Sequence, residues 1–134
     1  MNKQVISVMA DSQRRRAILV VEDETFVRWA VAEALRDTGY EVIEAANGDE
    51  AADILRAGVP FDLVFSDVRM PGSLDGLALL RLLRASRPET PVLVTSGHAE
   101  AASILASGAR CFVRKPYDLE ALIGLIEEAL RLPK

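Results

Sequence analysis

Five short runs rich in β-branched and other apolar residues recur along the chain, and they constrain its fold more than any other feature. They are AILVV (17–21), EVIEA (41–45), FDLVF (61–65), PVLVT (91–95) and CFVRK (111–115). The segments between them carry apolar residues at helical spacing. Strands that alternate with helices form a parallel sheet covered on both faces, so the sequence predicts an α/β fold. The expected architecture is (βα)5, a doubly wound five-stranded sheet in a three-layer sandwich.

Helix start and stop signals agree with this alternation. Gly39 ends the first helical segment. Its apolar residues at three- and four-residue intervals are Phe26, Trp29, Ala30, Ala34 and Leu35, and Trp29 is expected to be either a core residue or a partly exposed anchor. Asn47, Asp75 and Asp118 stand where the second, third and fifth helices begin, and each side chain can accept a hydrogen bond from the first turn. Residues 98–108 leave room for a short fourth helix of about two turns.

Length and composition indicate one domain. The chain has 134 residues, of which half are apolar, enough to bury a single core. We expect this domain to span residues 17–132, behind a flexible lead-in of residues 1–16. No apolar run reaches the roughly 18 residues that a membrane-spanning helix needs, and the lead-in lacks the apolar core of a secretory signal. The expected location is therefore the cytoplasm, with no membrane role.

Charge is distributed unevenly along the chain. The lead-in carries a net charge of +3, from four basic residues against one acidic residue, whereas the whole chain carries −4, so the remaining residues carry −7. Sequence-specific nucleic-acid binding usually needs a basic face. We therefore expect no direct contact between this acidic domain and nucleic acid.

The residues that follow the predicted strands are the candidates for function, because ligands of open α/β sheets bind beyond the carboxyl ends of the strands. Glu22 and Asp23 follow the first strand, Asp67 the third, Ser96 the fourth and Lys115 the fifth. Taken singly, these residues have ordinary explanations as helix N-terminal acids, turn residues and strand ends. Their joint occurrence at four of five strand ends favours a functional site.

This set of residues suits phosphoryl transfer. Three neighbouring carboxylates repel one another unless a hard divalent cation such as Mg²⁺ binds them. If Asp67 is the nucleophile, it attacks an in-line phosphoryl group, and Lys115 together with the metal neutralises the equatorial oxygens. The Ser96 hydroxyl can donate a hydrogen bond to one of those oxygens. The expected product is an acyl phosphate on Asp67.

The motifs together resemble the CheY-like receiver domain of two-component response regulators, from residue 17 to about residue 132. The matching stretches are ILVVEDE (18–24), DLVFSDVRMPG…DG (62–76), PVLVTSG (91–97), GARCFVRKP (108–116) and the closing amphipathic helix. The resemblance implies a flavodoxin-like fold and a Mg²⁺ site formed by Glu22, Asp23, Asp67 and the backbone carbonyl of Arg69. It also implies that Asp67 receives its phosphoryl group from a histidine kinase or a histidine phosphotransfer protein in a phosphorelay.

The same resemblance assigns the remaining site residues. Ser96 is the switch hydroxyl, Lys115 pairs with the phosphoryl group across a cis Lys115–Pro116 bond, and Phe112 is the aromatic residue that reports the switch. Arg69 and His98, each two residues beyond a site residue, influence the lifetime of the phosphorylated state. The output partner is left open, and the expected assembly is a monomer or a weak homodimer.

The chain departs from the usual family pattern at several positions. Glu22 replaces the more frequent aspartate of the acidic pair, and Phe112 offers no hydroxyl to a partner. Residues 97–114, the 18 residues between Ser96 and Lys115, are about three fewer than is usual. The fourth helix is therefore expected to be short, which puts in doubt the interaction surface that this helix commonly forms in the family.

Two other functions compete with a phosphoacceptor. One is a phosphate-independent pseudo-receiver that only binds partners, although every group required for phosphorylation is present. The other is a phosphohydrolase with an aspartyl nucleophile, which generally has a second acid two residues after the nucleophile; here that position is Arg69. We therefore expect a signalling module and not an enzyme. Whether the domain stands alone or belongs to a longer protein stays open.

Overall fold

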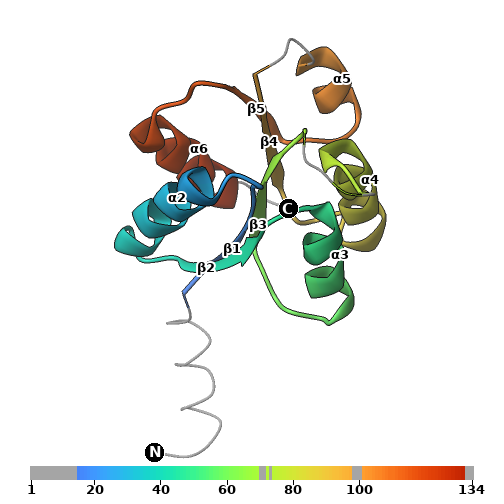
Figure 1. Ribbon diagram of the computed structural model, residues 1–134, viewed down its shortest axis with the longest axis horizontal. Helices are drawn as coiled ribbons and strands as arrows, with labels where there is room; N and C mark the ends of the chain where they lie inside the picture. Colours follow the sequence, from blue (N-terminus) through green and yellow to red (C-terminus); the bar gives the residue numbers. More distant parts are fainter. Residues whose placement is uncertain (1–14, 70–71, 73, 98–100, 132–134) are drawn as a thin grey trace, which may run out of the picture.

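The computed structural model describes residues 15–69, 72, 74–97 and 101–131, and its centre is a parallel sheet (Figure 1). The strands are β1 (Ala17–Val21), β2 (Glu41–Ala45), β3 (Leu63–Asp67), β4 (Val92–Ser96) and β5 (Cys111–Arg114). All four pairings are parallel, and the five strands lie in the order β2-β1-β3-β4-β5. The predicted α/β fold with a doubly wound sheet is confirmed.

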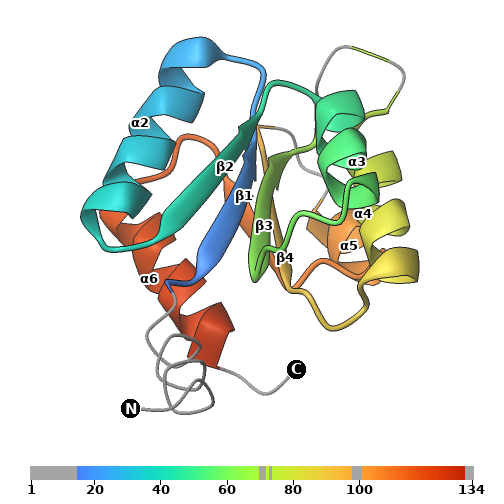
Figure 2. The same cartoon turned by 90° about the horizontal axis from the view of Figure 1, so that it is seen from below.

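Five helices in the described residues alternate with the strands. They are α2 (Thr25–Asp37), α3 (Gly48–Arg56), α4 (Gly76–Ser86), α5 (Ala101–Ala106) and α6 (Leu119–Arg131). Figure 2 shows α2 and α6 on one face of the sheet and α3, α4 and α5 on the other. The chain changes faces after β2, so the strand order reverses at β1 and β3. Their carboxyl ends therefore form the crevice in which such folds bind ligands.

The two faces of the sheet have separate apolar cores, because successive side chains of a strand point to opposite faces. Leu19 of β1 and Val64 of β3 pack with Leu83 of α4 on one face. Ile18 and Phe65, from the same two strands, belong to the core on the other face, under α2 and α6. Every residue of β1, β3 and β4 is buried, as expected for central strands of a parallel sheet.

The expected capping residues lie at helix N-termini. Asn47 accepts a hydrogen bond from the Glu50 N–H at 2.8 Å, and Asp75 accepts one from the Ala78 N–H at 2.9 Å. Asp118 accepts a hydrogen bond from the second residue of α6 at 3.2 Å. The described part of helix α5 has six residues, and residues 98–100 before it lie outside the described residues, so the short fourth helix expected from the spacing stays a prediction.

The predicted apolar stripe of the first helix does not face the core at its two largest residues, so the core interpretation of Trp29 is wrong and the alternative of a partly exposed residue is confirmed. Phe26 is 85% exposed and Trp29 is 59% exposed. The buried residues of α2 are Val31, Ala32 and Leu35, and of these only Leu35 belongs to the predicted stripe. Helix α2 carries two apolar stripes, and the one with compact aliphatic side chains packs on the sheet, so the aromatic stripe faces solvent.

No helix among the described residues is long and apolar enough to cross a membrane. Residues 1–14 and 132–134 lie outside the described residues, so the boundaries of the lead-in and of the domain stay predictions.

Candidate functional site

Three carboxylates meet at the carboxyl ends of β1 and β3. Glu22 and Asp23 follow β1, and Asp67 is the last residue of β3. The parallel register pairs Val21 with Ser66, which brings the next residue of each strand to the same edge of the sheet. One carboxylate oxygen from each acid lies within 4.8 Å of the others. The structure thus brings together the three acids expected from the sequence.

Lys115 supplies a cation to this cluster from the end of β5. Its Nζ donates a hydrogen bond to Asp67 Oδ2 at 2.6 Å and lies 3.7 Å from Glu22 Oε1. Its backbone N–H donates to the Ser96 carbonyl at 3.0 Å, and the Lys115–Pro116 bond is cis, as expected. Burial lowers the pKa of Lys115, but the hydrogen bond and the negative charge of Asp67 outweigh it, so the pKa is raised. The lysine is held as an ammonium group.

Burial makes ionisation of Glu22 unfavourable. Its side chain is almost fully buried, and burial raises its pKa from 4.5 to about 7. A hydrogen bond from the Glu24 N–H at 3.0 Å opposes this rise, whereas the neighbouring carboxyl groups of Asp23 and Asp67 add to it. One ammonium group does not offset three close carboxylates, two of them buried.

The donor set fits a hard divalent cation. All three side chains offer oxygen, which Mg²⁺ prefers, and Mg²⁺ sites in proteins typically use one or two carboxylates with water and phosphate oxygens. A cation at this position would favour the ionised form of Glu22 and relieve the repulsion among the acids. The group could therefore hold Mg²⁺, and no further described cluster of three such side chains was found that could hold a metal.

A pocket of about 280 Å³ opens beside Asp67, and other predicted site residues line it. Ser96, at the end of β4, is buried at its wall, next to the small Gly97. Arg69 is exposed at the rim, and its backbone N–H donates to Asp67 Oδ1 at 3.3 Å. His98, the other residue expected to influence lifetime, lies outside the described residues.

Phe112 lies on β5, the edge strand next to Ser96. Its ring is half-buried against the core under α3, α4 and α5, and the Arg114 guanidinium lies 6.0 Å from the ring centre. Beside it, the Thr95 hydroxyl donates to the Val113 carbonyl at 2.7 Å and ties β4 to β5. The aromatic residue and the Ser96 hydroxyl thus occupy adjacent strands.

Comparison with known proteins decides the family. Residues 18–127 match the family described as the response regulator receiver domain. The chain belongs to this family. Receiver domains are signalling modules of two-component systems and not classical enzymes, so the phosphohydrolase alternative is no longer supported.

Curated relatives of this receiver domain are regulators and a sensor kinase. It is 34% identical over 120 residues to the DNA-binding transcriptional regulator NtrC of Escherichia coli K12, covering 87% of this chain and 25% of the relative. It is 41% identical over 117 residues to the sensor kinase CckA of Brucella abortus, covering 84% of this chain and 12% of the kinase. The chain thus spans about a quarter or less of the length of these relatives.

Solved receiver structures share the fold. The receiver domain of NtrX from Brucella abortus is 42% identical, with a TM-score of 0.78, and the match covers 84% of this chain and 97% of that one. A response regulator receiver protein from Sinorhizobium medicae WSM419 gives a TM-score of 0.83 at 27% identity, covering 90% and 98%.

The structure of the receiver domain also shows a contact that the sequence did not reveal. A side chain on Gly76, the first residue of α4, would meet the backbone carbonyl of Asp67 and would come within 2.6 Å of Val68 Cα. The Gly76 N–H donates to the Val68 carbonyl at 2.9 Å. Glycine is therefore required where the start of α4 packs against the backbone of Asp67 and Val68. The DG pair in the sequence was the available signal.

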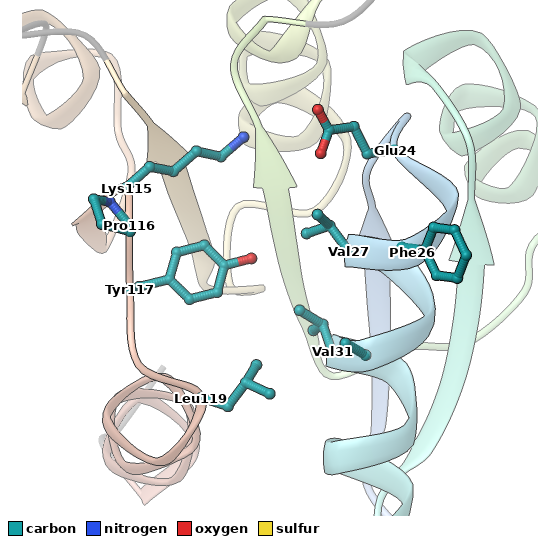
Figure 3. A pocket seen from close by; sticks show the side chains of 9 residues that line it. Glu24, Phe26, Val27, Val31, Lys115, Pro116, Tyr117 and Leu119 are labelled. Atoms are coloured by element: carbon teal, nitrogen blue, oxygen red, sulfur yellow. The ribbon is translucent and has the colours of Figure 1, made fainter.

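A second, mostly apolar pocket of the receiver domain lies next to the acidic cluster, between α2 and the chain that leads into α6 (Figure 3). Its volume is about 570 Å³, and Phe26, Val27 and Leu119 are among its lining residues. Glu24 and Lys115 line both pockets. Sequence reasoning gave Glu24 no role of its own.

Tyr117 is a further residue of this pocket that the sequence reasoning missed. Its ring packs edge-on against Phe65 at 5.6 Å, and its hydroxyl is buried without a hydrogen-bond partner among the described residues. Burial and the negative charge of Glu22 raise the pKa of Tyr117 to about 12, so the hydroxyl keeps its proton.

Proposed function

We propose that this receiver domain accepts a phosphoryl group on Asp67 and uses it to change partner binding. The observation that carries the proposal is the arrangement around Asp67. Its carboxylate is buried, held by Lys115 Nζ at 2.6 Å, and grouped with the two other acids of a candidate metal site. A buried, oriented carboxylate beside a cation and an open pocket is poised for nucleophilic attack.

The side chains divide the chemistry of transfer. An Asp67 carboxylate oxygen forms the new O–P bond while the bond from phosphorus to the donor breaks, and the leaving group keeps that electron pair. Lys115 moves from pairing with the carboxylate to pairing with a phosphoryl oxygen, and the Ser96 hydroxyl donates to another. Glu22, Asp23, Asp67 and the Arg69 carbonyl would hold Mg²⁺, which supplies charge neutralisation of the phosphoryl oxygens.

The switch follows from the same residues. A hydrogen bond between Ser96 and the phosphoryl group would draw the end of β4 toward Asp67, and Phe112 on the adjacent strand would repack with it. Arg69 at the rim, and His98, would influence how readily water reaches the acyl phosphate. The output partner would recognise the repacked surface.

The partners and setting are part of the proposal. The donor is a histidine kinase or a histidine phosphotransfer protein, in line with a sensor kinase among the relatives. We propose a cytoplasmic monomer or weak homodimer that binds neither nucleic acid nor membrane directly. The acidic charge of the domain supports the absence of direct nucleic-acid binding. A phosphate-independent pseudo-receiver is the remaining alternative, and the Lys115–Asp67 contact counts against it.

Intact-mass measurement after incubation with acetyl phosphate and Mg²⁺ tests the proposal. The wild type should gain one phosphoryl group of about 80 Da, and the gain should be absent with EDTA and absent in Asp67→Asn. Glu128→Gln, which changes an exposed acid of α6, is the matched control and should be labelled normally. A folded wild-type protein that gains no mass under any condition would favour the pseudo-receiver.

A further inference from the structure

Glu24 occupies the boundary between the phosphoacceptor pocket and the apolar pocket, and it is exposed. Figure 3 shows its carboxylate and the Lys115 ammonium group at the same end of the apolar pocket. A donor that reaches Asp67 from this side passes both groups. Glu24 is therefore placed to act on the donor.

The described residues reveal no structural role for the Glu24 carboxylate. It stands at the N-cap position of α2, but its side chain makes no capping hydrogen bond. It lies outside the group of three acids that could hold a metal, and within the described part of the chain it forms no salt bridge. Only its backbone N–H serves the site, through the hydrogen bond to Glu22.

The negative charge of Glu24 also stays unbalanced when the acidic cluster holds a divalent cation. A divalent cation and Lys115 together balance Glu22, Asp23 and Asp67, so Glu24 adds a negative charge at the mouth that neither cation offsets. Such a charge repels a dianion more strongly than a monoanion. Arg69, elsewhere on the rim, attracts both and is the same in every variant at position 24.

We propose that Glu24 acts as a charge filter at the mouth of the phosphoacceptor site, disfavouring dianionic acyl phosphates relative to N-phosphorylated donors of lower negative charge. This inference rests on the proposed function. Acetyl phosphate is a dianion at neutral pH, and its transfer to Asp67 breaks an O–P bond and releases acetate. Phosphoramidate carries about one negative charge less, and its transfer breaks an N–P bond, as in phosphohistidine, and releases ammonia.

Labelling rates with these two small donors test the filter. With acetyl phosphate, Mg²⁺ and low salt, Glu24→Gln should be labelled about two- to fivefold faster than the wild type, and Glu24→Lys faster still. The gain with phosphoramidate should be clearly smaller. Both gains should shrink in about 0.5 M salt, because ions screen exposed charges. Glu128→Gln, the same change on an exposed residue at the opposite end of the sheet, should leave both rates unchanged.

Each other outcome has a defined meaning. Equal gains with both donors, gains that persist in high salt, or no change in Glu24→Gln would overturn the filter while the proposed function stands. A slower Glu24→Gln would also overturn it and would make the carboxylate a helper of transfer. A wild type that neither donor labels would refute the proposed function itself. Circular dichroism of each variant confirms that the fold is intact.

Discussion

Replacing Glu22 with glutamine should stabilise the metal-free protein, and the gain should depend on pH. Glu22 is 3% exposed, and its pKa rises from 4.5 to about 7 on folding, chiefly because of burial. Between these values the folded state holds a proton that the unfolded state has lost. The free energy of unfolding therefore falls as pH rises through this window, and the penalty is complete above about pH 7. Glutamine carries no charge, so the variant escapes the penalty.

The magnitude follows from the size of the shift. Each pKa unit corresponds to about 1.4 kcal/mol, so a rise from 4.5 to about 7 gives on the order of 3 kcal/mol. The variant keeps the acceptor for the Glu24 N–H, but it loses the ion pair with Lys115 at 3.7 Å, which reduces the gain. We expect the free energy of unfolding of Glu22→Gln to exceed that of the wild type by about 2–3 kcal/mol at about pH 8 and to equal it near pH 4.5.

Urea unfolding of both proteins in EDTA, from about pH 4.5 to pH 8, measures the difference. Glu128→Gln serves as the control and should follow the wild type at every pH. Millimolar Mg²⁺ should reduce the difference in unfolding free energy between Glu22→Gln and the wild type at pH 8, because the metal stabilises only the wild type, which keeps all three carboxylates. A difference that is constant across pH, or a variant that is less stable at pH 8 in EDTA, would refute the electrostatic reasoning.

Two further predictions concern packing, both read from chemical unfolding. Gly76→Ala should lower the free energy of unfolding by about 2 kcal/mol or more and slow labelling by acetyl phosphate, because the new methyl group meets the backbone at Val68. Gly124→Ala on α6, where an added methyl group meets nothing within 4 Å, should raise the free energy of unfolding by up to about 1 kcal/mol. If both variants behave alike, the close approach is absent. Leu83→Ala, at a fully buried position of α4, should lower the free energy of unfolding by about 2–5 kcal/mol without abolishing labelling by acetyl phosphate. A loss below about 1 kcal/mol would contradict the packing described for this core.

The strand-end residues could be predicted because parallel strands bring their carboxyl ends to one edge. Asp67, Ser96 and Lys115 are separated by 29 and 19 positions in the sequence, yet each follows a recognisable apolar run. Locating the runs was therefore enough to place the residues together. The direction of the side chains and the 2.6 Å contact between Lys115 and Asp67 needed the structure.

The first helix shows why the rest could not be predicted. Phe26 and Trp29 form one apolar stripe, and Val27, Val31 and Leu35 form another. Both stripes have helical spacing, so periodicity alone does not choose between them. The choice depends on packing against β1 and β3, where the aliphatic stripe joins the core. The close approach of Gly76 to Asp67 is likewise a long-range backbone contact, which no local pattern encodes.

Lys115 and Asp67 should shift the pKa of Glu22 in opposite directions, which makes the electrostatic account testable by sign. Burial sets most of the rise, Asp67 adds to it, and Lys115 opposes it. The free energy of unfolding stops falling with pH above the pKa of Glu22. In EDTA, Lys115→Met should therefore raise the pH at which this levelling occurs relative to the wild type, and Asp67→Asn should lower it. Carboxyl ¹³C NMR of Glu22 reads the same shifts directly. Shifts in the same direction would show that repacking, not charge, controls the protonation of Glu22.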